Sequence, residues 1–353
     1  MMKTIRVLIT AIGSASGINA LMALRMLGTK TKITIIGIDA NPLSAGLKLA
    51  DKGFVVPKIS EEDKYFKTVY EIIEEEDIDA CLPVFSKEIP IFARRKTEFM
   101  KKTGIPLCIP SIDILNKVND KYLFYQFLKE ISVLTPKTMT LPKNKDLLFR
   151  EFGFPFVIKK RIGAGARSIW FIHNESEVDL FYNSKDLQTS DSEATGLSEF
   201  IAQQFLSGKE YTIDFCCDFG GKLLGAVIRE RLEVRDGKTT KGRTIYDESI
   251  LREIERIFEK IKFTGPGNIQ GFLTESPKKE FLMTELNPRF AAGGLPLTVE
   301  AGFNIPAIIV KLIANPKIEI GQFKQYTPGK IMLRYYDQVF IDDETQKSWE
   351  LED

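Results

Sequence analysis

The stretch NIQGFLTESPKKEFLMTELNPR, residues Asn268–Arg289, decides the fold of the second half of this 353-residue chain. Two strand-like runs, Asn268–Glu275 and Glu280–Asn287, flank a turn centred on Pro277-Lys278. Apolar and β-branched runs on either side of a proline-containing turn are typical of a β-hairpin. The stretch therefore predicts two antiparallel strands.

Three oxygen-bearing side chains meet on one face of this predicted hairpin. If the strands are symmetric about their turn, Gln270 lies opposite Glu285, with the two Cβ atoms about 4.5–5.5 Å apart. Asn287 is two residues beyond Glu285 and so projects from the same face. Magnesium prefers hard oxygen ligands of this kind, with phosphate and water completing its coordination. An ordinary polar strand face has the same alternation, so the hairpin alone leaves a magnesium site and a solvated face as alternatives.

The residues that follow the hairpin favour the magnesium site. Arg289 places a fixed positive charge next to the three oxygen-bearing side chains, and Gly293-Gly294 offers backbone N–H groups that an anion can approach closely. Metal, arginine and backbone donors together suit phosphoryl transfer, because its transition state is stabilised mainly by charge and positioning. Arg289 is therefore the candidate catalytic residue.

A second group of residues is suited to bind a nucleotide. Lys159 ends an apolar strand-like run, and a loop containing Gly163, Gly165 and Ser168 follows it. Such a loop can fold over phosphates with its backbone amides, while a lysine supplies a point charge. Lys121, in the first turn of a predicted helix, is a further candidate. Solvated lysines and an ordinary glycine turn are the alternatives.

The segment QQFLSGKE, Gln203–Glu210, has the pattern of a strand that ends in a turn. Such a turn leaves the backbone near Phe205 and Leu206 free to bond an adenine edge, and Glu210 can accept hydrogen bonds from ribose hydroxyls. A predicted hairpin further along also places Glu210 opposite Arg231, so a cross-strand ion pair is the alternative, and both can hold.

The first third of the chain has a different periodicity. Strand-like runs alternate there with helix-like runs: Ile5–Thr10, Asn19–Leu27, Ile33–Ile38, Tyr65–Glu76 and Ala80–Val84. This alternation predicts an α/β fold with a doubly wound parallel sheet, followed by an α+β part in which hairpins dominate. The glycine turn after the first strand resembles a dinucleotide fingerprint but lacks its spacing, so an NAD-dependent oxidoreductase is the weaker alternative.

Composition narrows the function classes. The 49 Lys and Arg residues against 48 Asp and Glu give a net charge of +1, which argues against nucleic acid or a membrane surface as a partner. The longest uncharged stretch, Val7–Leu24, is too polar for a spanning helix, so we expect a cytoplasmic protein. The four cysteines show no CxxC pattern and are expected to be reduced. His173, the single histidine, is expected to be a solvated strand end.

The order of these motifs resembles the ATP-grasp superfamily. The hairpin stretch is similar to that of the carbamoyl-phosphate synthase large chain, and Gly37–Pro42 and Ala50-Asp51-Lys52 resemble its pre-ATP-grasp pattern. The resemblance covers nearly the whole chain and implies one module. Its parts would be a Rossmann-like pre-ATP-grasp domain (1–117), an ATP-grasp domain (118–315, with a lid-bearing part 118–200 and a metal-bearing part 201–315) and a C-terminal extension (316–353).

The resemblance also implies a role for each site residue. Glu285 would bridge two Mg²⁺ ions, for which Mn²⁺ can substitute, while Gln270 would hold one ion and Asn287 the other. Arg289 would steady the transferred phosphoryl group. ATP would lie against the following residues: Lys121, Lys159, Gly163, Gly165 and Ser168 at the phosphates, Gln203, Phe205 and Leu206 at the adenine, and Glu210 at the ribose. Gln203 stands where many members carry a Glu.

The function that the resemblance implies is an ATP-dependent ligase. A small-molecule carboxylate would be activated as an acylphosphate and attacked by an amine. Arg229 or Lys241, from a basic run otherwise expected to be a solvated hairpin, can meet the acceptor carboxylate. The alternative is a nucleotide-binding module without turnover, or a partner subunit of a split carbamoyl-phosphate-synthase-like system. Many relatives form dimers, which makes a homodimer the expected assembly.

Overall fold

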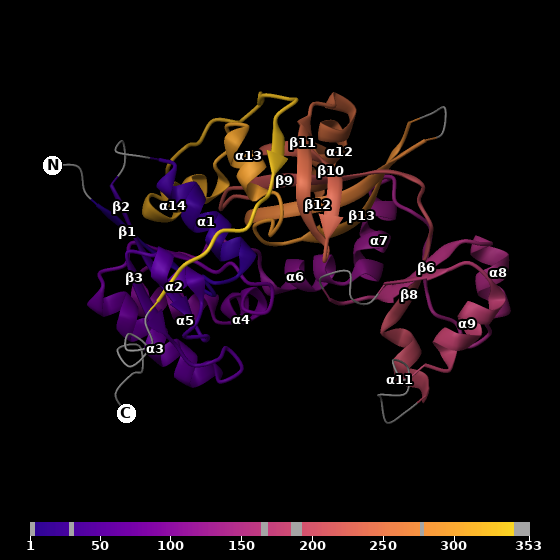
Figure 1. Cartoon of the computed structure of the whole chain (residues 1–353), viewed down its shortest axis with the longest axis horizontal. Coiled ribbons are helices and arrows are strands. Elements are labelled where there is room, and N and C mark those ends of the chain that lie inside the picture. The colour runs from indigo at the N-terminus through magenta and orange to yellow at the C-terminus, as the bar shows by residue number, and fades with distance from the viewer. Residues whose placement is uncertain (1–3, 28–31, 164–168, 185–192, 276–278, 342–353) are drawn as a thin grey trace.

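The computed structural model describes residues 4–27, 32–163, 169–184, 193–275 and 279–341. Within these ranges the strands form sheets of order β3-β2-β1-β4, β5-β8-β6-β7 and β13-β12-β9-β10-β11-β14 (Figure 1). The first two sheets lie towards opposite ends of the longest axis, and the third lies between them. None of the helices in these ranges combines the length and the apolar character needed to cross a membrane.

The first sheet is parallel throughout, as the alternation of strand-like and helix-like runs predicts. Its elements are β1 (Ile5–Ile9), α1 (Ala15–Arg25), β2 (Ile33–Asp39), α2 (Ala45–Leu49), β3 (Lys52–Val55), α3 (Glu62–Glu75), β4 (Ala80–Leu82), α4 (Ile89–Arg94) and α5 (Lys96–Thr103). Consecutive residues of β1 are completely buried, which shows that both faces of the sheet are covered. Polar side chains therefore gather where the strands end, with Thr10 after β1 and Asp39 at the end of β2.

Two helices join the first sheet to the rest of the chain, namely α6 (Ile112–Asn119) and α7 (Lys121–Glu130). The sequence predicts α7 and a cap at Asn119 or Asp120, and the cap is Asp120, whose carboxylate accepts from the backbone N–H groups of Tyr122 and Leu123. Helix α6 occupies a segment expected only to hold a boundary. Its residues Leu115 and Val118 are buried, so this segment packs as part of the fold.

The second sheet is antiparallel and carries a core on one face only. Its elements are β5 (Thr138–Thr140), α8 (Asp146–Phe152), β6 (Phe156–Lys160), β7 (Ile169–Ile172), α9 (Glu175–Tyr182), α11 (Glu193–Ser198) and β8 (Phe200–Gln204). Phe156, Ile158 and Phe200 pack with residues of α8 and α9, which leaves the alternate residues on the other face. The polar, acidic sequence of residues 189–196 predicts a loop. This prediction is wrong for residues 193–196, which begin α11. Residues 189–192 lie outside the described residues.

The third sheet is also antiparallel and separates an apolar face from a polar one. Its elements are β9 (Gly208–Cys217), β10 (Leu223–Arg235), β11 (Lys238–Ile245), α12 (Glu248–Lys260), β12 (Gly265–Thr274), β13 (Phe281–Asn287), α13 (Leu295–Glu300), α14 (Ile305–Ala314) and β14 (Ile331–Leu333). Ile213, Phe215 and Ile269 pack in one core with Ile254 of α12. The intervening residues, including Asp214 and Gln270, therefore share the opposite face.

Two local features of this sheet follow from strand alternation. The adjacent Cys216 and Cys217 belong to different core clusters, as expected for neighbours on a strand, and all four cysteines are free and buried. The predicted pairing of Gln270 with Glu285 is confirmed, but a register shift follows it, so that Gly271 pairs with Met283. The predicted symmetry about Pro277-Lys278 therefore holds only for the part of the hairpin farther from the turn than this shift, where the oxygen-bearing residues lie.

Candidate active site

The oxygen triad, Gln270, Glu285 and Asn287, lies on the polar face of β12 and β13. Gln270 and Glu285 are cross-strand partners, and Asn287 Nδ2 donates to Glu285 Oε1 at 3.1 Å. Because the Asn287 amide turns its nitrogen towards Glu285, its Oδ1 atom remains available as a ligand. No group of three or more His, Cys, Asp or Glu side chains suited to a metal occurs in the described ranges. The triad therefore offers one carboxylate and two amide oxygens, a donor set that fits Mg²⁺ when phosphates complete it.

Two lysines from other elements surround the single carboxylate of the triad. Lys121 Nζ, in the first turn of α7, lies 3.8 Å from Glu285 Oε2. Burial alone would raise the pKa of Glu285, but the charges of Lys121 and Lys159 and the hydrogen bond from Asn287 outweigh it and hold that pKa below its usual value. Glu285 is therefore ionised at neutral pH.

Lys159 is a buried ammonium group without a partner of its own. Its side chain sits on the open face of the second sheet, is only 7% exposed, and forms no hydrogen bond or ion pair with the described residues. Burial lowers the pKa of Lys159 to about 8, against the attraction of Glu285. An anion placed beside this ammonium would relieve its desolvation, which is what a nucleotide phosphate would do.

The glycine loop begins against Lys121. Lys121 Nζ donates to the carbonyl oxygen of Gly163 at 2.9 Å, so one lysine contacts both the start of this loop and the triad. Gly163 has φ of 142°, a conformation that suits glycine. Gly165 and Ser168, predicted to contact phosphates, lie outside the described residues.

The predicted base and ribose residues lie at the junction of β8 and β9. β8 ends at Gln204 and β9 begins at Gly208, so the backbone of Phe205 and Leu206 lies outside both ladders. Gln203 is 5% exposed and precedes this junction. The backbone of this connection is thus free of ladder hydrogen bonds, and its contact with an adenine edge stays a prediction.

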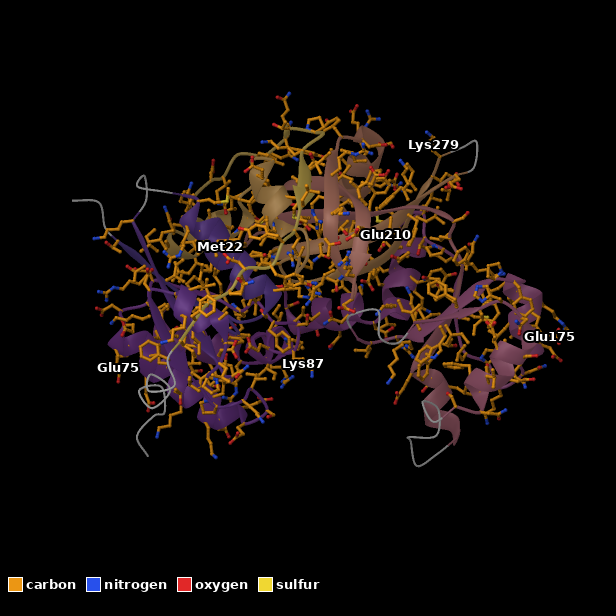
Figure 2. The ribbon with its side chains drawn as sticks, in the orientation of Figure 1. Met22, Glu75, Lys87, Glu175, Glu210 and Lys279 are labelled. Carbon is orange, nitrogen blue, oxygen red and sulfur yellow. The ribbon has the colours of Figure 1, made fainter. Side chains whose placement is uncertain are left out.

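Glu210 forms the predicted cross-strand ion pair with Arg231. Burial raises the pKa of Glu210, partly offset by the Arg231 guanidinium. Figure 2 shows Glu210 in the interior of the view, whereas Glu75 and Glu175 lie at the periphery. About a quarter of its side chain remains exposed, which leaves one carboxylate oxygen for a further donor.

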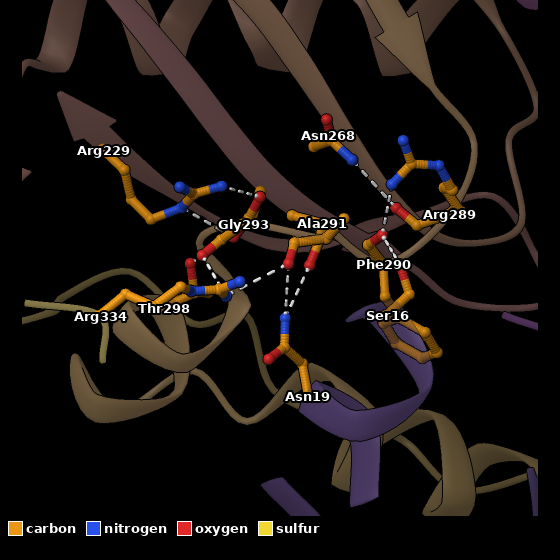
Figure 3. Close-up of polar contacts among 12 residues, drawn as sticks. Ser16, Asn19, Arg229, Asn268, Arg289, Phe290, Ala291, Gly293, Thr298 and Arg334 are labelled. Carbon is orange, nitrogen blue, oxygen red and sulfur yellow. Dashed lines mark hydrogen bonds and ion pairs between the residues drawn. The ribbon is translucent and has the colours of Figure 1, made fainter. Parts of the chain in front are cut away.

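The Arg289 loop, residues 289–294, is held through its carbonyl oxygens (Figure 3). Ser16 Oγ, near the start of α1, donates to the oxygen of Phe290 at 3.1 Å. Asn19 Nδ2 donates to the oxygen of Ala292 at 2.9 Å. Helix α1 therefore holds the loop that follows the triad through hydrogen bonds to its carbonyl oxygens.

The far end of the Arg289 loop is held by the C-terminal part of the chain. Arg334 Nη2, just beyond β14, donates to the carbonyl oxygen of Gly293 at 2.9 Å. A Cβ atom on Gly293 would lie 2.5 Å from the backbone nitrogen of Thr239, so the loop passes against β11 where only glycine fits. The Arg289 guanidinium itself donates to the oxygen of Phe290 at 3.0 Å.

A buried ion pair lies directly beneath this loop. Arg229 Nε and Nη2 donate to the two carboxylate oxygens of Asp214 at 2.9 and 2.7 Å, and both side chains are 1% exposed. Thr298 Oγ1 of α13 also donates to Asp214. A Cβ atom on Gly294 would lie 1.6 Å from Arg229 Nη1, which shows how closely the loop packs on the guanidinium.

The two predicted acceptor residues thus have different surroundings. Arg229 departs from the solvated hairpin expected for the basic run, because its charge is enclosed with Asp214 below the Arg289 loop. Lys241 conforms to that expectation, since its side chain is 52% exposed and its Nζ lies 2.9 Å from Glu233. His173 is likewise exposed, as expected, and pairs only with Glu177 among the described residues.

Several residues around the Arg289 loop were not predicted from the sequence. They are Ser16, Asn19, Asp214, Thr298 and Arg334. Asp214 carried a usable signal, because it is a carboxylate between the apolar residues Ile213 and Phe215 and so demanded a buried partner. Ser16, Asn19 and Arg334 lie far from the loop in sequence, and neither they nor Thr298 had a comparable signal.

Comparison with protein families matches two parts of the chain. Residues 197–330 match the family described as ATP-grasp in the biosynthetic pathway with Ter operon, and residues 7–108 match a PylC-like N-terminal domain. The first match contains all of the oxygen triad. The resemblance to the ATP-grasp superfamily is therefore shown, with a match to an ATP-grasp family model that follows a match to a PylC-like N-terminal domain.

Within that superfamily the chain is similar to a single module of the carbamoyl phosphate synthase large chain. It is 23% identical over 317 residues to that of Clostridium perfringens and 24% identical over 318 residues to the arginine-specific large chain of Bacillus subtilis. Each alignment covers 86% of this chain but 28% of the relative, so the chain spans little more than a quarter of their length.

Solved structures of other ATP-grasp proteins share the fold. The biotin carboxylase domain dimer of Hydrogenobacter thermophilus 2-oxoglutarate carboxylase, determined with MgADP and bicarbonate, gives a TM-score of 0.69 at 18% identity, covering 90% of this chain and 71% of that one. N5-carboxyaminoimidazole synthetase of Staphylococcus aureus with ADP gives 0.67 at 16% identity, covering 94% and 81%. These similarities establish a mixed α/β fold of the ATP-grasp type.

Proposed function

We propose that this chain is an ATP-dependent ligase that activates a small-molecule carboxylate as an acylphosphate for attack by an amine. One observation carries the proposal: Lys159, a buried lysine without a hydrogen bond or ion pair among the described residues, and a second lysine, Lys121, lie beside the single carboxylate of the oxygen triad. Two positive charges beside a hard-oxygen ligand set are what a magnesium–triphosphate group requires. The match of residues 197–330 to an ATP-grasp family model supports the same function.

ATP is proposed to lie between the second and third sheets. Its phosphates would lie beside Lys159 and would share Lys121 with the start of the glycine loop. The adenine would bond the free backbone of Phe205 and Leu206, and the ribose would donate to Glu210. Neutralisation of Lys159 by phosphate would contribute to affinity, because this ammonium is buried and forms no ion pair within the described ranges.

The oxygen triad fits Mg²⁺, and we propose that Glu285 bridges two ions while Gln270 and Asn287 hold one each. The metal would supply charge neutralisation at the β- and γ-phosphates. The part played by the protein is to present three oxygens on one strand face. The hydrogen bond from Asn287 fixes two of these side chains relative to each other. Mn²⁺ is proposed to substitute because it accepts the same hard oxygen ligands.

The proposed chemistry has two steps. An oxygen of the substrate carboxylate attacks the γ-phosphorus of ATP, the bond from that phosphorus to the β–γ bridging oxygen breaks, and ADP leaves. The amine nitrogen then attacks the acyl carbon, phosphate leaves with the C–O bonding pair, and the nitrogen loses a proton. Arg289 is proposed to stabilise charge on the transferred phosphoryl group, from a position fixed by the hydrogen bonds of the Arg289 loop.

The Arg229–Asp214 pair changes which residue we propose to contact the acceptor carboxylate. Because Arg229 is enclosed beneath the loop, we propose that it supports the loop that faces the acceptor, and that an exposed residue such as Lys241 makes any direct contact. We also propose the domain bounds 1–117, 118–315 and 316–353, and a homodimer as the assembly.

The test is ADP formation with a panel of carboxylates and amines. We expect wild-type protein to release ADP only when a carboxylate is present, and Glu285→Ala to lower that rate by roughly 10³-fold or more while keeping the wild-type melting temperature. Glu275→Ala, which removes an exposed carboxylate of the same hairpin, is the matched control and should behave as wild type.

Two results would contradict the proposal in different ways. Wild-type ADP formation by Glu285→Ala would reject the metal assignment. ATP binding without ADP release across the panel would favour the alternative, a nucleotide-binding module or the partner subunit of a split carbamoyl-phosphate-synthase-like system.

A further inference from the structure

Gln203 shares a sheet face with the proposed phosphate-binding lysine. Gln203 is the register partner of Thr138 on β5 and of Val157 on β6, while Lys159 is the partner of Ile201. Residues two apart on a strand lie on one face, so Lys159, Gln203 and Thr138 all project from the face opposite the α8–α9 core. Two residues along a strand span about 6.6 Å, which is the offset between the positions of Lys159 and Gln203 on this face. A nucleotide whose phosphates meet Lys159 would thus have its base near Gln203.

A chain of hydrogen bonds fixes the orientation of the Gln203 amide. Thr138 Oγ1 lies 2.9 Å from the carbonyl oxygen of Pro136, and Gln203 Nε2 lies 2.8 Å from Thr138 Oγ1. A threonine hydroxyl has one proton, and the Pro136 oxygen can only accept. The proton is therefore committed to Pro136, so that Thr138 can only accept from Gln203. The amide must turn its NH₂ group towards Thr138.

The other end of the amide is consequently an acceptor. Gln203 Oε1 receives no hydrogen bond from the described residues, and the side chain as a whole is 5% exposed. A buried carbonyl oxygen of this kind matches a ligand N–H group and rejects a ligand carbonyl. At position 6 of a purine, adenine carries an amino donor, whereas hypoxanthine and guanine carry a carbonyl acceptor.

We propose that Thr138 is a positioning residue that orients Gln203 and thereby makes the site select 6-amino over 6-oxo purine nucleotides. The proposal rests on the proposed nucleotide site and adds its base specificity. A glutamate at position 203 would accept with either oxygen, but a glutamine reversed by 180° becomes a donor and accommodates a 6-oxo purine. In this chain reversal would set Gln203 Oε1 against the Thr138 oxygen, or draw the Thr138 proton away from Pro136 and leave that buried carbonyl unpaired.

The experiment measures dissociation constants for MgATP and MgITP by isothermal titration calorimetry on the full chain. ITP replaces the 6-amino group of ATP by a carbonyl and adds no 2-amino group, so it isolates the contact at position 6. We expect Thr138→Val to reduce the wild-type preference for ATP over ITP by about tenfold, because the amide is then free to reverse. Thr138→Ser retains the hydroxyl and should retain the preference.

Two further variants separate orientation from general damage. Thr140→Val removes a hydroxyl from the same short strand without a contact to Gln203 and should leave the preference unchanged. In a Gln203→Glu background both oxygens accept, so adding Thr138→Val should no longer change the ratio. If Thr138→Val does not fold, Thr138→Ala supplies the same comparison.

The outcomes distinguish this inference from the proposed function. A wild-type chain that binds neither nucleotide would overturn both. A wild-type chain that prefers ATP, with the same ratio after Thr138→Val, would overturn only the role of Thr138. An equal loss of preference from Thr138→Val in the wild-type and Gln203→Glu backgrounds would also overturn it, because orientation would then not be the cause.

Discussion

The first and third sheets place their polar residues in opposite ways. In the parallel first sheet the strands are buried on both faces, and the buried polar groups Thr10 and Glu88, like Asp39, lie at or beyond strand ends. In the antiparallel third sheet the polar groups follow the strands themselves, as Asp214 and Gln270 do. A sheet covered on both sides can present chemistry only at its edge, whereas a sheet with one free face can present a surface.

The energetic demands on the two arrangements also differ. Charged groups within the third sheet have oppositely charged partners at bonding distance, as in the Asp214–Arg229 pair. At the end of the first sheet Glu88 accepts from two hydroxyl donors, Thr10 Oγ1 at 2.6 Å and Tyr65 OH at 3.3 Å, and no cation pairs with it in the part of the chain that the structure describes. Burial raises the pKa of Glu88 to about 7, against the effect of those hydrogen bonds and helped by Asp39. The two regions can therefore be tested separately.

The largest effect is expected from breaking the ion pair inside the third sheet. Asp214→Ala leaves the Arg229 guanidinium buried without a counterion, and we expect the free energy of unfolding to fall by about 3–5 kcal/mol. Chemical denaturation measures this change. The double variant Asp214→Leu/Arg229→Met replaces the pair by apolar groups and should recover most of the loss. A single variant within about 1 kcal/mol of wild type would show that the pair is not what holds this face together.

The next effect is a pH dependence at the end of the first sheet. Native Glu88 keeps its proton up to a pKa of about 7, whereas the unfolded chain releases it near the ordinary value of 4.5. The unfolded state therefore binds fewer protons between these pH values, and stability falls as pH rises through that window, by up to about 3 kcal/mol.

Glu88→Gln removes this titration. The unfolding free energy of the variant relative to wild type should therefore shift by about 2–3 kcal/mol in its favour between pH 5 and pH 8. Glu75→Gln, an exposed change on α3, is the control and should track wild type. Parallel pH profiles for Glu88→Gln and wild type would contradict the assignment of a buried protonated carboxyl.

The smallest effect concerns the lysine that faces the third sheet. Burial lowers the pKa of Lys159 to about 8, so this group loses its charge as pH rises. If phosphate binds the charged form, the affinity for MgATP should fall about tenfold between pH 7 and pH 9, with proton uptake on binding at the higher pH. Lys159→Arg keeps its charge and should flatten the profile. A flat wild-type profile would exclude Lys159 from the phosphate site.

The same contrast explains which elements the sequence could predict. Alternation and hairpin symmetry predicted the pairing of Gln270 with Glu285 and of Glu210 with Arg231, because both depend only on contacts between neighbours in sequence. Short elements such as α6 and β14 were not predicted. β14 pairs with β11 from 86 or more residues further along, and such a pairing leaves no local periodicity to recognise.

The residues of the candidate site likewise fall into those whose position follows from local sequence and those whose position depends on the assembled fold. The triad and Lys159 lie on regular strands, where spacing determines the face. The partners of the Arg289 loop come from α1 and from beyond β14, and a serine or asparagine there resembles any helix-turn residue in sequence. Arg229 was placed in the right hairpin, but its burial depends on Asp214 and Thr298, which only the assembled fold brings to it.

The hydrogen bonds that hold the Arg289 loop have a consequence for biosynthesis. During translation the ribbon that bears the triad is complete once residue 287 has emerged from the ribosome, and Ser16 and Asn19 have been synthesised before it. Arg334 follows almost fifty residues later, and only then can it donate to the carbonyl oxygen of Gly293. A nascent chain that has not yet reached Arg334 would therefore carry every candidate ligand while the Arg289 loop lacked this hydrogen bond, so the order of synthesis delays the full fixation of the loop.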